Sequence, residues 1–303
     1  MRNLITDFNL RGYISKFLLF AWLFCLTTQL AKAQDSLSHH KPPRVVPWFV
    51  ERFRISAGAF LPVNNTNIQV GVQGGADGTD INFEKDLGFS KAQLTFLANA
   101  QWRISSRSRL NLNYYNIPRS STHTLQKDIT FRDSTYPVNA TVNSFFNTAI
   151  YQFSYGYSIL SKPTYEVGVL IGAHIVGGKA GIGLATQSGS ASRSTNFGFT
   201  APLPDIGLWG GYTFSNKLAA TLDIDYLSLT VNNITGSIFA YDIHILYRVA
   251  SKLDLSLGYT GLNFKVTATR QNANGMFKWG YNGPSLGVSY SFGKRPWVTA
   301  DLH

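Results

Sequence analysis

The stretch Ala149 to Leu160 reads A-I-Y-Q-F-S-Y-G-Y-S-I-L and decides the fold. Every second residue from Ala149 to Ile159 is apolar or aromatic, and the residues between them include Gln152, Ser154 and Ser158. A period of two residues predicts a β-strand with one apolar face and one polar face. The strand is long enough to cross a bilayer and the pattern recurs along the chain, so the sequence predicts a transmembrane β-barrel.

Residues 1–33 have the features of a secretory signal peptide. Basic residues precede a short apolar run, 17–26, and Ala31-Lys32-Ala33 has the small-x-small pattern of a cleavage site. The run is too short for a membrane-spanning helix, which needs about 20 apolar residues. The only cysteine, Cys25, lies in this segment, so the mature chain cannot hold a disulfide framework. We therefore expect a cleaved signal peptide and a place in the cell outer membrane.

The composition favours a barrel over a soluble domain. Charged residues make up 14% of the chain and aromatic residues another 14%, whereas soluble domains have about 25% charged residues. Without residues 1–33 the net charge is +8, but the basic residues are spread over turns and loops and form no run. We therefore expect contact with outer-membrane lipids, including lipopolysaccharide, and no nucleic-acid partner. The sequence indicates neither a cofactor nor a metal site, and leaves the oligomeric state open.

The organisation along the chain follows from the same alternation. Residues 34–48 are polar and proline-rich, which predicts a flexible periplasmic arm. Residues 49–293 form the barrel, and 294–303 are a C-terminal extension. We expect about ten antiparallel strands, within a range of eight to twelve, in an up-and-down order with short periplasmic turns and long extracellular loops. Their approximate ranges are 53–62, 93–104, 109–119, 143–160, 164–184, 202–214, 218–231, 236–250, 253–270 and 276–292. The first long loop, 63–92, is expected to form a small hairpin outside the membrane.

The two faces of these strands differ in charge. About 50 positions fall on the expected lipid face, and none is Asp, Glu, Lys or Arg. Chance would place about seven charges there, and a Lys or Arg at the midplane costs about 2–4 kcal/mol. The interleaved positions are expected to form a charge network in the lumen, with these members: Arg54, Arg103, Glu166, Asp223, Asp225, Asp242, His244, Arg248 and Asp254.

Two resemblances support this interpretation. The last strand alternates Leu286, Val288, Tyr290 and Phe292, and resembles the aromatic-terminated signal that the barrel-assembly machinery reads on outer-membrane proteins. That resemblance implies this machinery as a partner. Several blocks are similar to those of an uncharacterised family of Gram-negative outer-membrane barrels, which implies the fold and the location but no activity. The blocks are 81–88 (I-N-F-E-K-D-L-G), 154–158 (S-Y-G-Y-S), 202–208 (P-L-P-D-I-G-L) and 282–284 (N-G-P).

One cluster could carry chemistry. Asp223-x-Asp225 and Asp242-x-His244 both point inward, and a loop at 232–235 would place Asp225 opposite Asp242 and Asp223 opposite His244. A histidine beside a carboxylate can act as a general base. The residue types and spacing resemble the Asp–Asp and Asp–His couples of the omptin family of outer-membrane proteases, which would imply a membrane-embedded hydrolase. The alternative, which we favour, is a salt-bridge network that pairs the charges in the lumen.

Three functions are compatible with these features. The first is a non-enzymatic barrel that serves envelope structure, surface interaction or very limited solute passage, because barrels of this size have interiors filled by side chains. The second is the hydrolase. The third is a binder of hydrophobic or glycan ligands at the loop mouth through aromatic residues, which could equally form an interfacial girdle: Phe131, Tyr136, Phe145 and Phe146. Asp80, Glu84 and Asp86 could hold Ca²⁺, but a solvated or lysine-paired loop is favoured.

Overall fold

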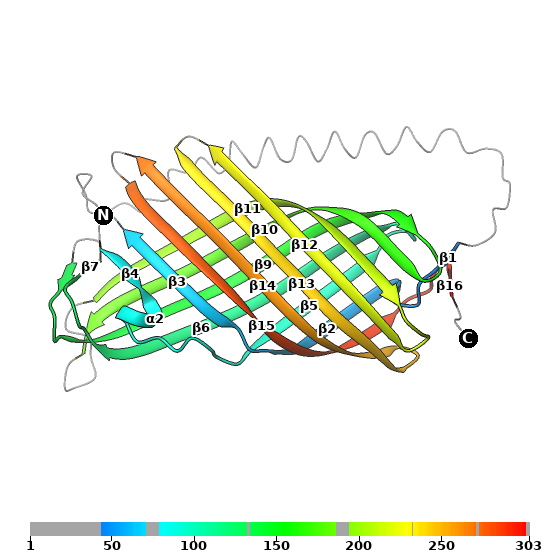
Figure 1. Cartoon of the computed structure of the whole chain (residues 1–303), viewed down its shortest axis with the longest axis horizontal. Coiled ribbons are helices and arrows are strands. Elements are labelled where there is room, and N and C mark those ends of the chain that lie inside the picture. The colour runs from blue at the N-terminus through cyan, green and yellow to red at the C-terminus, as the bar shows by residue number, and fades with distance from the viewer. Residues whose placement is uncertain are drawn as a thin grey trace. The chain divides into compact units, whose positions relative to one another are not determined.

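The computed structural model describes residues 44–70, 79–131, 134–185, 194–231, 233–270 and 273–300. Within these residues ten antiparallel strands form a closed ring, because β14 pairs with both β13 and β15, and β15 also pairs with β2 (Figure 1). The predicted up-and-down barrel of ten strands is therefore confirmed. The ring consists of β2 (Phe53–Phe60), β5 (Thr95–Arg103), β6 (Ser108–Thr124), β9 (Thr141–Ser161), β10 (Tyr165–Leu184), β11 (Ser194–Thr213), β12 (Leu218–Val231), β13 (Ile234–Ala250), β14 (Leu253–Arg270) and β15 (Ala273–Phe292).

The first strand of the wall, β2, is followed along the same edge of β15 by a second strand, β3. Pro62 follows β2, and β3 (Val63–Val70) then runs on beside β15, with Val63 opposite Asn282. On its other edge β3 pairs with β4 (Asp80–Asn82). The first loop therefore forms the expected hairpin, and one of its strands, β3, also belongs to the wall through its pairing with β15. β3 replaces β2 against β15 because β15 extends well beyond the end of β2.

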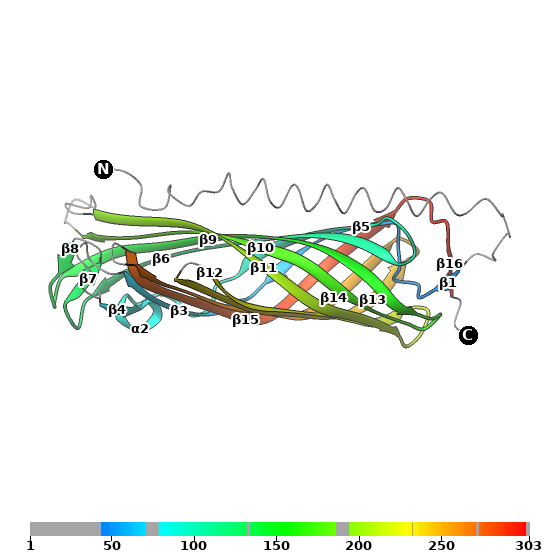
Figure 2. The same cartoon turned by 90° about the horizontal axis from the view of Figure 1, so that it is seen from above.

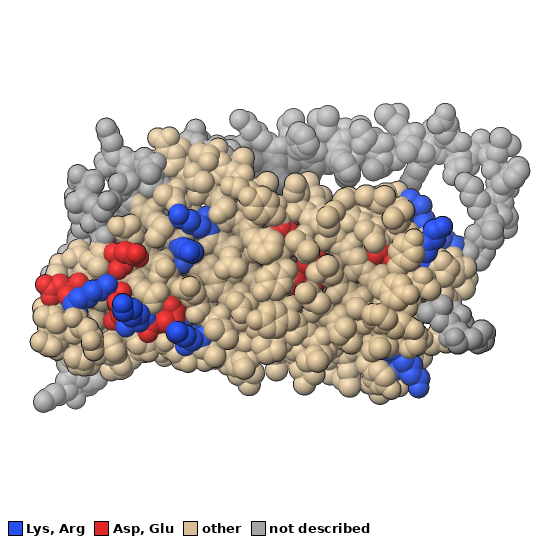
Figure 3. Space-filling view, in the orientation of Figure 1, with Lys and Arg blue, Asp and Glu red and all other residues tan. Residues whose placement is uncertain are grey.

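The outer surface has the layering of a membrane-spanning wall. Leu255, Leu257 and Leu286 project outward and are exposed, and aromatic side chains border this apolar band on both sides. The periplasmic border is formed by Phe53, Trp102, Tyr212, Tyr247, Tyr290 and Phe292, and the other by Phe96, Tyr114, Tyr151, Tyr226, Phe239, Tyr241 and Tyr259. On the face shown in Figure 3, basic side chains lie toward the two ends, and only small patches of acidic atoms show between them. Apolar bands with aromatic girdles are typical of outer-membrane barrels.

No helix among the described residues is both long enough and apolar enough to span a membrane.

β11 and β12 separate above the membrane band. Their pairing ends at Ile206 opposite Tyr226, although β11 stays paired with β10 as far as Ser194 (Figure 1). The amide of Thr213 donates toward β10 and that of Phe214 toward β12, so the even-numbered amides of β11 point at β12. Pro202 and Pro204 are even-numbered and carry no N–H group. The two prolines thus remove the donors that would continue the pairing.

The interior changes character along the barrel axis. Near the periplasm the inward side chains are polar or charged, whereas in the extracellular part they form an apolar core. Core members from the wall include Ile117, Phe146, Phe264 and Trp279. Outside the bilayer the wall meets water, so apolar side chains turn inward as in a soluble protein.

A short helix, α2 (Phe83–Asp86), anchors the first loop in this core. Phe83 is buried and packs edge-on against Phe146, with ring centroids 5.3 Å apart. The side chain of Asn82 caps the helix by accepting a hydrogen bond of 2.8 Å from the amide of Lys85. Gly88 ends the segment at φ +68°, and a Cβ there would press against His123. The block 81–88 therefore builds the extracellular closure of the barrel.

A second hairpin completes this core. β7 (Ile129–Phe131) pairs with β8 (Ser134–Tyr136), and Ile129, Phe131 and Tyr136 are fully buried. The hydroxyl of Tyr136 donates to the carbonyl of Ile182 at 2.8 Å, which ties the hairpin to β10. The long loop between β6 and β9 is thus folded onto the wall.

Segments from both ends of the described chain close the periplasmic side. β1 (Val45–Val46) pairs in parallel with β16 (Val298–Thr299). Val46, Trp48, Phe49 and Trp297 are buried with Ala219 and Leu246 of the wall. The prediction of a flexible arm is therefore wrong for 44–48, because these apolar side chains have a barrel end to cover. Residues 34–43 and the predicted signal peptide lie outside the described residues.

Candidate functional site in the barrel lumen

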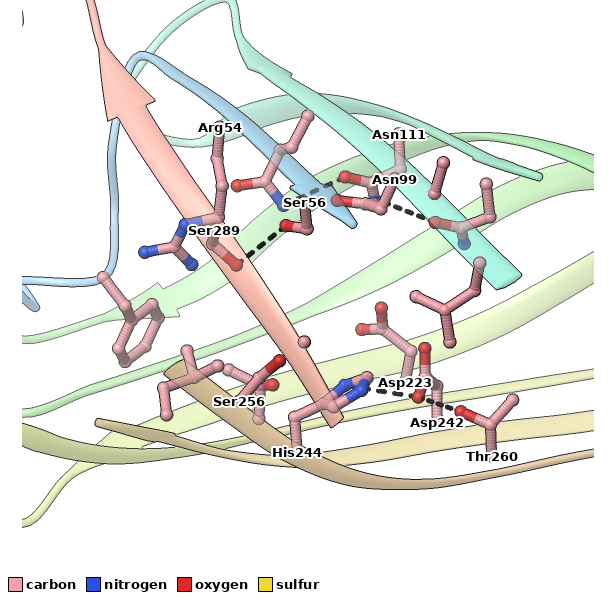
Figure 4. A pocket seen from close by; sticks show the side chains of 18 of the residues that line it. Arg54, Ser56, Asn99, Asn111, Asp223, Asp242, His244, Ser256, Thr260 and Ser289 are labelled. Carbon is pink, nitrogen blue, oxygen red and sulfur yellow. Dashed lines mark hydrogen bonds and ion pairs between the residues drawn. The ribbon is translucent and has the colours of Figure 1, made fainter. Parts of the chain in front are cut away.

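The lumen beneath the apolar core holds a polar cavity of about 130 Å³. One wall is an amide and serine surface from β2, β5, β6 and β15, which includes Asn99, Asn111 and Ser289 (Figure 4). The opposite wall comes from β12, β13 and β14 and carries Asp223, Asp242, His244 and Thr260. The inward faces of the strands are thus polar where their outward faces are apolar, which is the reverse of a soluble protein. This is a transmembrane β-barrel of the outer-membrane type.

Similarity to known proteins is found among solved structures. No protein-family model and no curated protein sequence matches the chain. Among solved structures, the outer membrane protease OmpT from Escherichia coli is 11% identical with a TM-score of 0.49, and 79% of this chain covers 97% of that one. Neisserial surface protein A is 13% identical with a TM-score of 0.32, over 79% of this chain and 97% of that one. Ail, the attachment invasion locus protein of Yersinia pestis, is 8% identical with a TM-score of 0.31, over 78% and 99%.

Asp223 is held by Arg109, a basic residue that the predicted lumen network did not include. Arg109 Nη2 donates to Asp223 Oδ1 at 2.7 Å, and the guanidinium lies 3.8 Å from the ring centroid of Trp209. The signal was present in the sequence: Leu110 and Leu112 face outward, so Arg109 must face inward in the same strand. The carboxylate of Asp223 is therefore neutralised by a neighbour that also stacks on an aromatic ring.

Asp242 and His244 form a second group with a serine that the sequence analysis missed. His244 Nδ1 lies 3.3 Å from Asp242 Oδ1, and His244 Nε2 lies 3.4 Å from Ser285 Oγ. Thr260 Oγ1 donates to Asp242 Oδ1 at 2.6 Å. His244 reaches Ser285 across the intervening strand only because position 258 is glycine, where a Cβ would overlap the imidazole ring.

The predicted register of β12 and β13 is wrong by two residues. Asp223 lies opposite Asp242, Asp225 opposite Ala240, and His244 opposite Thr221. The cause is the turn: Val231 pairs with Ile234, so the connection has two residues and not four. Its second residue, Asn233, has φ +64°, as the favoured two-residue hairpin turns require. A shift of two residues keeps every side chain on its face, so the inward placement is unaffected.

Asp225 is separate from the Asp242 group. It is buried, and Gln152 Nε2 donates to its Oδ2 at 3.1 Å. Beside it, on β11, Asp205 Oδ2 lies 2.7 Å from His174 Nδ1, and both of these side chains are buried. Asp225 therefore has hydrogen-bond partners of its own, although it lines one small cavity together with Asp223 and Asp242, and Asp205 is a further carboxylate that the sequence analysis left out.

A two-pronged ion pair lies at the edge of the cavity, which Arg103 lines. Arg103 Nη1 and Nη2 donate to the two carboxylate oxygens of Glu166 at 2.7 and 2.6 Å. The exposed fractions are 1% for Arg103 and 0% for Glu166. Such two-pronged pairing satisfies a buried guanidinium and a buried carboxylate together.

The remaining charges bind the periplasmic closure to the wall. Arg54 Nη2 donates to Asp254 Oδ2 at 3.0 Å, and Arg248 lies between Asp254 and Glu51, with Nη2 at 3.1 Å from Glu51 Oε1. Arg295 donates to the same oxygen at 2.9 Å. Arg248 also stacks on Trp48, at 4.1 Å from its centroid. Glu51 is therefore the point at which the two ends of the described chain and the wall are joined.

Described residues lie across the barrel interior on both sides of the cavity. Phe49 forms part of its floor. Above it Tyr115 and Tyr281 pack with Phe60, with ring centroids 5.4–6.3 Å apart, and the apolar core follows. A second cavity of about 20 Å³ beside Gln152 has room for about one water molecule.

The loop-mouth aromatics do not form an exposed binding surface. Phe131, Tyr136 and Phe146 are fully buried in the apolar core, and Phe145 is half-buried. For the first three, both the ligand contact and the favoured alternative of an interfacial girdle are wrong, because the extracellular part of the wall needs them as a core. Leu286, Val288, Tyr290 and Phe292 face outward on β15, and their role as an assembly signal stays a prediction.

The acidic loop residues are bound within the protein. Glu84 Oε1 accepts a hydrogen bond of 2.6 Å from Arg119, and its Oε2 accepts one of 2.9 Å from the amide of Thr66. Asp86 Oδ2 lies 2.8 Å from Lys127 Nζ. Among the described residues no group of three or more His, Cys, Asp or Glu side chains is arranged to hold a metal ion.

Proposed function

We propose that the protein is a closed, non-enzymatic outer-membrane barrel that serves the envelope and presents a folded extracellular surface for interaction. One observation supports this most: both ends of the lumen are covered by folded segments of the chain, and the space between them is about 130 Å³. Ligand pockets commonly measure about 300–1,000 Å³. The space suits a few water molecules that solvate the ion pairs, and neither end offers a solute a ready path.

The extracellular part has the features of a rigid platform. Its apolar core, the short helix α2 and the β7–β8 hairpin fix loops that would otherwise be free to move. A surface fixed in this way loses little conformational entropy when a partner binds. Envelope structure and surface interaction therefore rank above solute passage.

Closure can be tested by the reactivity of a single cysteine. Ser256 lines the cavity and Cys25 is the only natural cysteine, so Ser256→Cys gives the mature chain one reporter thiol. In folded protein we expect slow reaction of this thiol with a small methanethiosulfonate reagent. Adding Trp48→Ala and Phe49→Ala removes the floor of the cavity and should accelerate the reaction, which mass spectrometry would follow.

The control places the thiol at the exposed turn residue Lys162, where the two alanine substitutions should change nothing. Planar-bilayer recording of the wild type gives an independent readout, and a large, stable, porin-like conductance would contradict the closed barrel. The closed barrel would also be contradicted if the thiol of Ser256→Cys reacted equally fast with and without the substitutions Trp48→Ala and Phe49→Ala.

Hydrolysis is the second candidate function, and one observation favours it. Ser285, His244 and Asp242 follow one another at 3.4 and 3.3 Å, in the order of a nucleophile, a base and an acid. Ser285 is only 5% exposed, however, and folded segments of the chain cover both ends of the lumen. We expect purified wild-type protein to hydrolyse neither peptide nor phospholipid substrates. Hydrolysis that disappears in a folded His244→Ala variant would reverse the order of the two candidates.

A further inference from the structure

Two lysines face each other on the outer wall without a counter-charge. Lys265 of β14 lies directly opposite Lys278 of β15, and both side chains are exposed. Like charges at opposed positions of neighbouring strands destabilise a sheet. Among the described residues neither side chain forms a hydrogen bond or an ion pair. The two ammonium groups therefore repel each other, and no described residue of the wall supplies a counter-charge.

The flanking positions are neutral and polar. Ser237 lies beside Lys265 on β13, Asn67 lies beside Lys278 on β3, and Asn82 of β4 follows Asn67. The nearest acidic residues are Asp86, whose Oδ2 accepts from the amide of Asn82 at 2.9 Å and lies 2.8 Å from Lys127 Nζ, and Asp80, two residues further along β4. The two ammonium groups thus stand in a row of side chains that can form hydrogen bonds, and the row carries no opposing charge.

The wall below the lysines is layered. Tyr241 and Tyr259 stack with ring centroids 6.4 Å apart at the upper border of the apolar band. Above them come two asparagines, Asn282, which accepts a hydrogen bond of 2.8 Å from Tyr259 Oη, and the exposed Asn263. The lysines form the next layer. From the membrane outward the surface is therefore aromatic, then amide, then cationic.

The height of the lysines limits the kind of partner. Lys265 is six residues above Tyr259 in the same strand, which is about 20 Å along the strand. With a strand tilt of about 35–45° the two layers are about 15 Å apart along the membrane normal. Headgroup phosphates at the border of the acyl chains are too low to reach this layer. Anionic groups on sugars that stand above the headgroups are at the right height.

We propose that Lys265 and Lys278 bind the phosphate or carboxylate groups of the core oligosaccharide of lipopolysaccharide, with the asparagine layer facing its sugars. Amide side chains hydrogen-bond sugar hydroxyls, and paired ammonium groups attract an anion with two or more oxygens. The proposal rests on the outer-membrane setting of the proposed function and is independent of whether the lumen is closed. A porin-like conductance would therefore contradict the closed barrel without contradicting the binding of lipopolysaccharide by the two lysines.

The test compares binding of lipopolysaccharides by full-length protein in detergent or nanodiscs. The variant Lys265→Gln/Lys278→Gln removes both charges and keeps polar side chains of similar length. Lys162→Gln/Lys252→Gln removes the same charge from exposed periplasmic turns and is the matched control. Since each lysine near an anionic surface contributes about fivefold in affinity, we expect the first variant to bind complete-core lipopolysaccharide about 30-fold more weakly. The control variant should bind like the wild type.

Three results would overturn the proposal. The first is equal binding by both double variants. The second is equally tight binding of lipid A without core sugars, which would place the contact at the headgroup. The third is competition by inorganic phosphate that abolishes the difference between core-bearing and core-lacking lipopolysaccharide. The Lys265→Gln/Lys278→Gln protein should unfold at a temperature no lower than the wild type, because it loses a repulsive pair, so weaker binding could not be ascribed to misfolding.

Discussion

Replacing Glu166 by Gln should lower the free energy of unfolding by about 3–5 kcal/mol, the range measured when one partner of a buried ion pair is removed. The substitution preserves size and leaves the guanidinium of Arg103 without a counter-charge in a part of the lumen that is closed to solvent. Arg103 is 1% exposed, and the Trp209 ring lies 5.0 Å from its guanidinium carbon. Urea titration of the protein in micelles, followed by heat-modifiable gel migration, would measure the loss.

The matching control removes both charges. Arg103→Met/Glu166→Leu should restore most of the stability, because apolar residues of similar volume often replace buried ion pairs without loss. If Glu166→Gln unfolds at the same urea concentration as the wild type, the pair is not the buried charge centre described above. If the double variant is as unstable as the single one, the loss comes from packing and not from the unpaired charge.

A lysine introduced at Leu257 should destabilise the barrel by about 2–4 kcal/mol, the cost of Lys or Arg at the bilayer midplane on the lipid face of a barrel. Leu257 is 60% exposed and lies between Ile245 and Leu286, which also point outward. An ammonium group there would have only acyl chains and apolar side chains around it. Folding into phospholipid vesicles at a series of urea concentrations would give the free energy.

Ser120→Lys provides the comparison at another depth. Ser120 is outward and exposed on β6, six residues above the girdle residue Tyr114, where the expected cost is about 0–1 kcal/mol. A similar loss for both variants would mean that the apolar band has been placed at the wrong height. No loss for Leu257→Lys would contradict the membrane-spanning wall itself.

The strand pattern of the wall could be predicted because a lipid-facing side chain has no alternative to being apolar. Leu255, Leu257 and Tyr259 alternate with Asp254, Ser256 and Thr260, and this parity places each side chain without knowledge of the strand partners. The same parity predicts the inward direction of Arg54 and Glu166. Which inward residue meets which depends on register, and there a two-residue error at Asn232–Asn233 was enough to pair the wrong carboxylates.

The parts of the barrel above and below the bilayer were harder to predict. Phe83, Phe131 and Phe146 are aromatic residues near loops, and the sequence does not distinguish a core from an exposed mouth, because both use the same side chains. Trp48 and Phe49 stand in a proline-rich segment that has no strand period, so nothing local reveals the barrel end that they cover. Ser285 was missed because its contact with His244 depends on Gly258, in the strand between the two residues, and on the exact register of the three strands.

The parallel pairing of β1 with β16 has a consequence for biogenesis. Val45 and Val298 are separated by almost the entire barrel sequence, so this two-stranded ribbon can form only once the wall between them has curled round and sealed. Trp48 and Trp297 must reach their places at the same late stage, each donating its indole N–H to a backbone carbonyl, of Ser215 and Val50 respectively. The pairing of β1 with β16 therefore marks a completed barrel. In a stalled or partly inserted chain the two indole rings would be exposed to water, where quality-control proteases could recognise them.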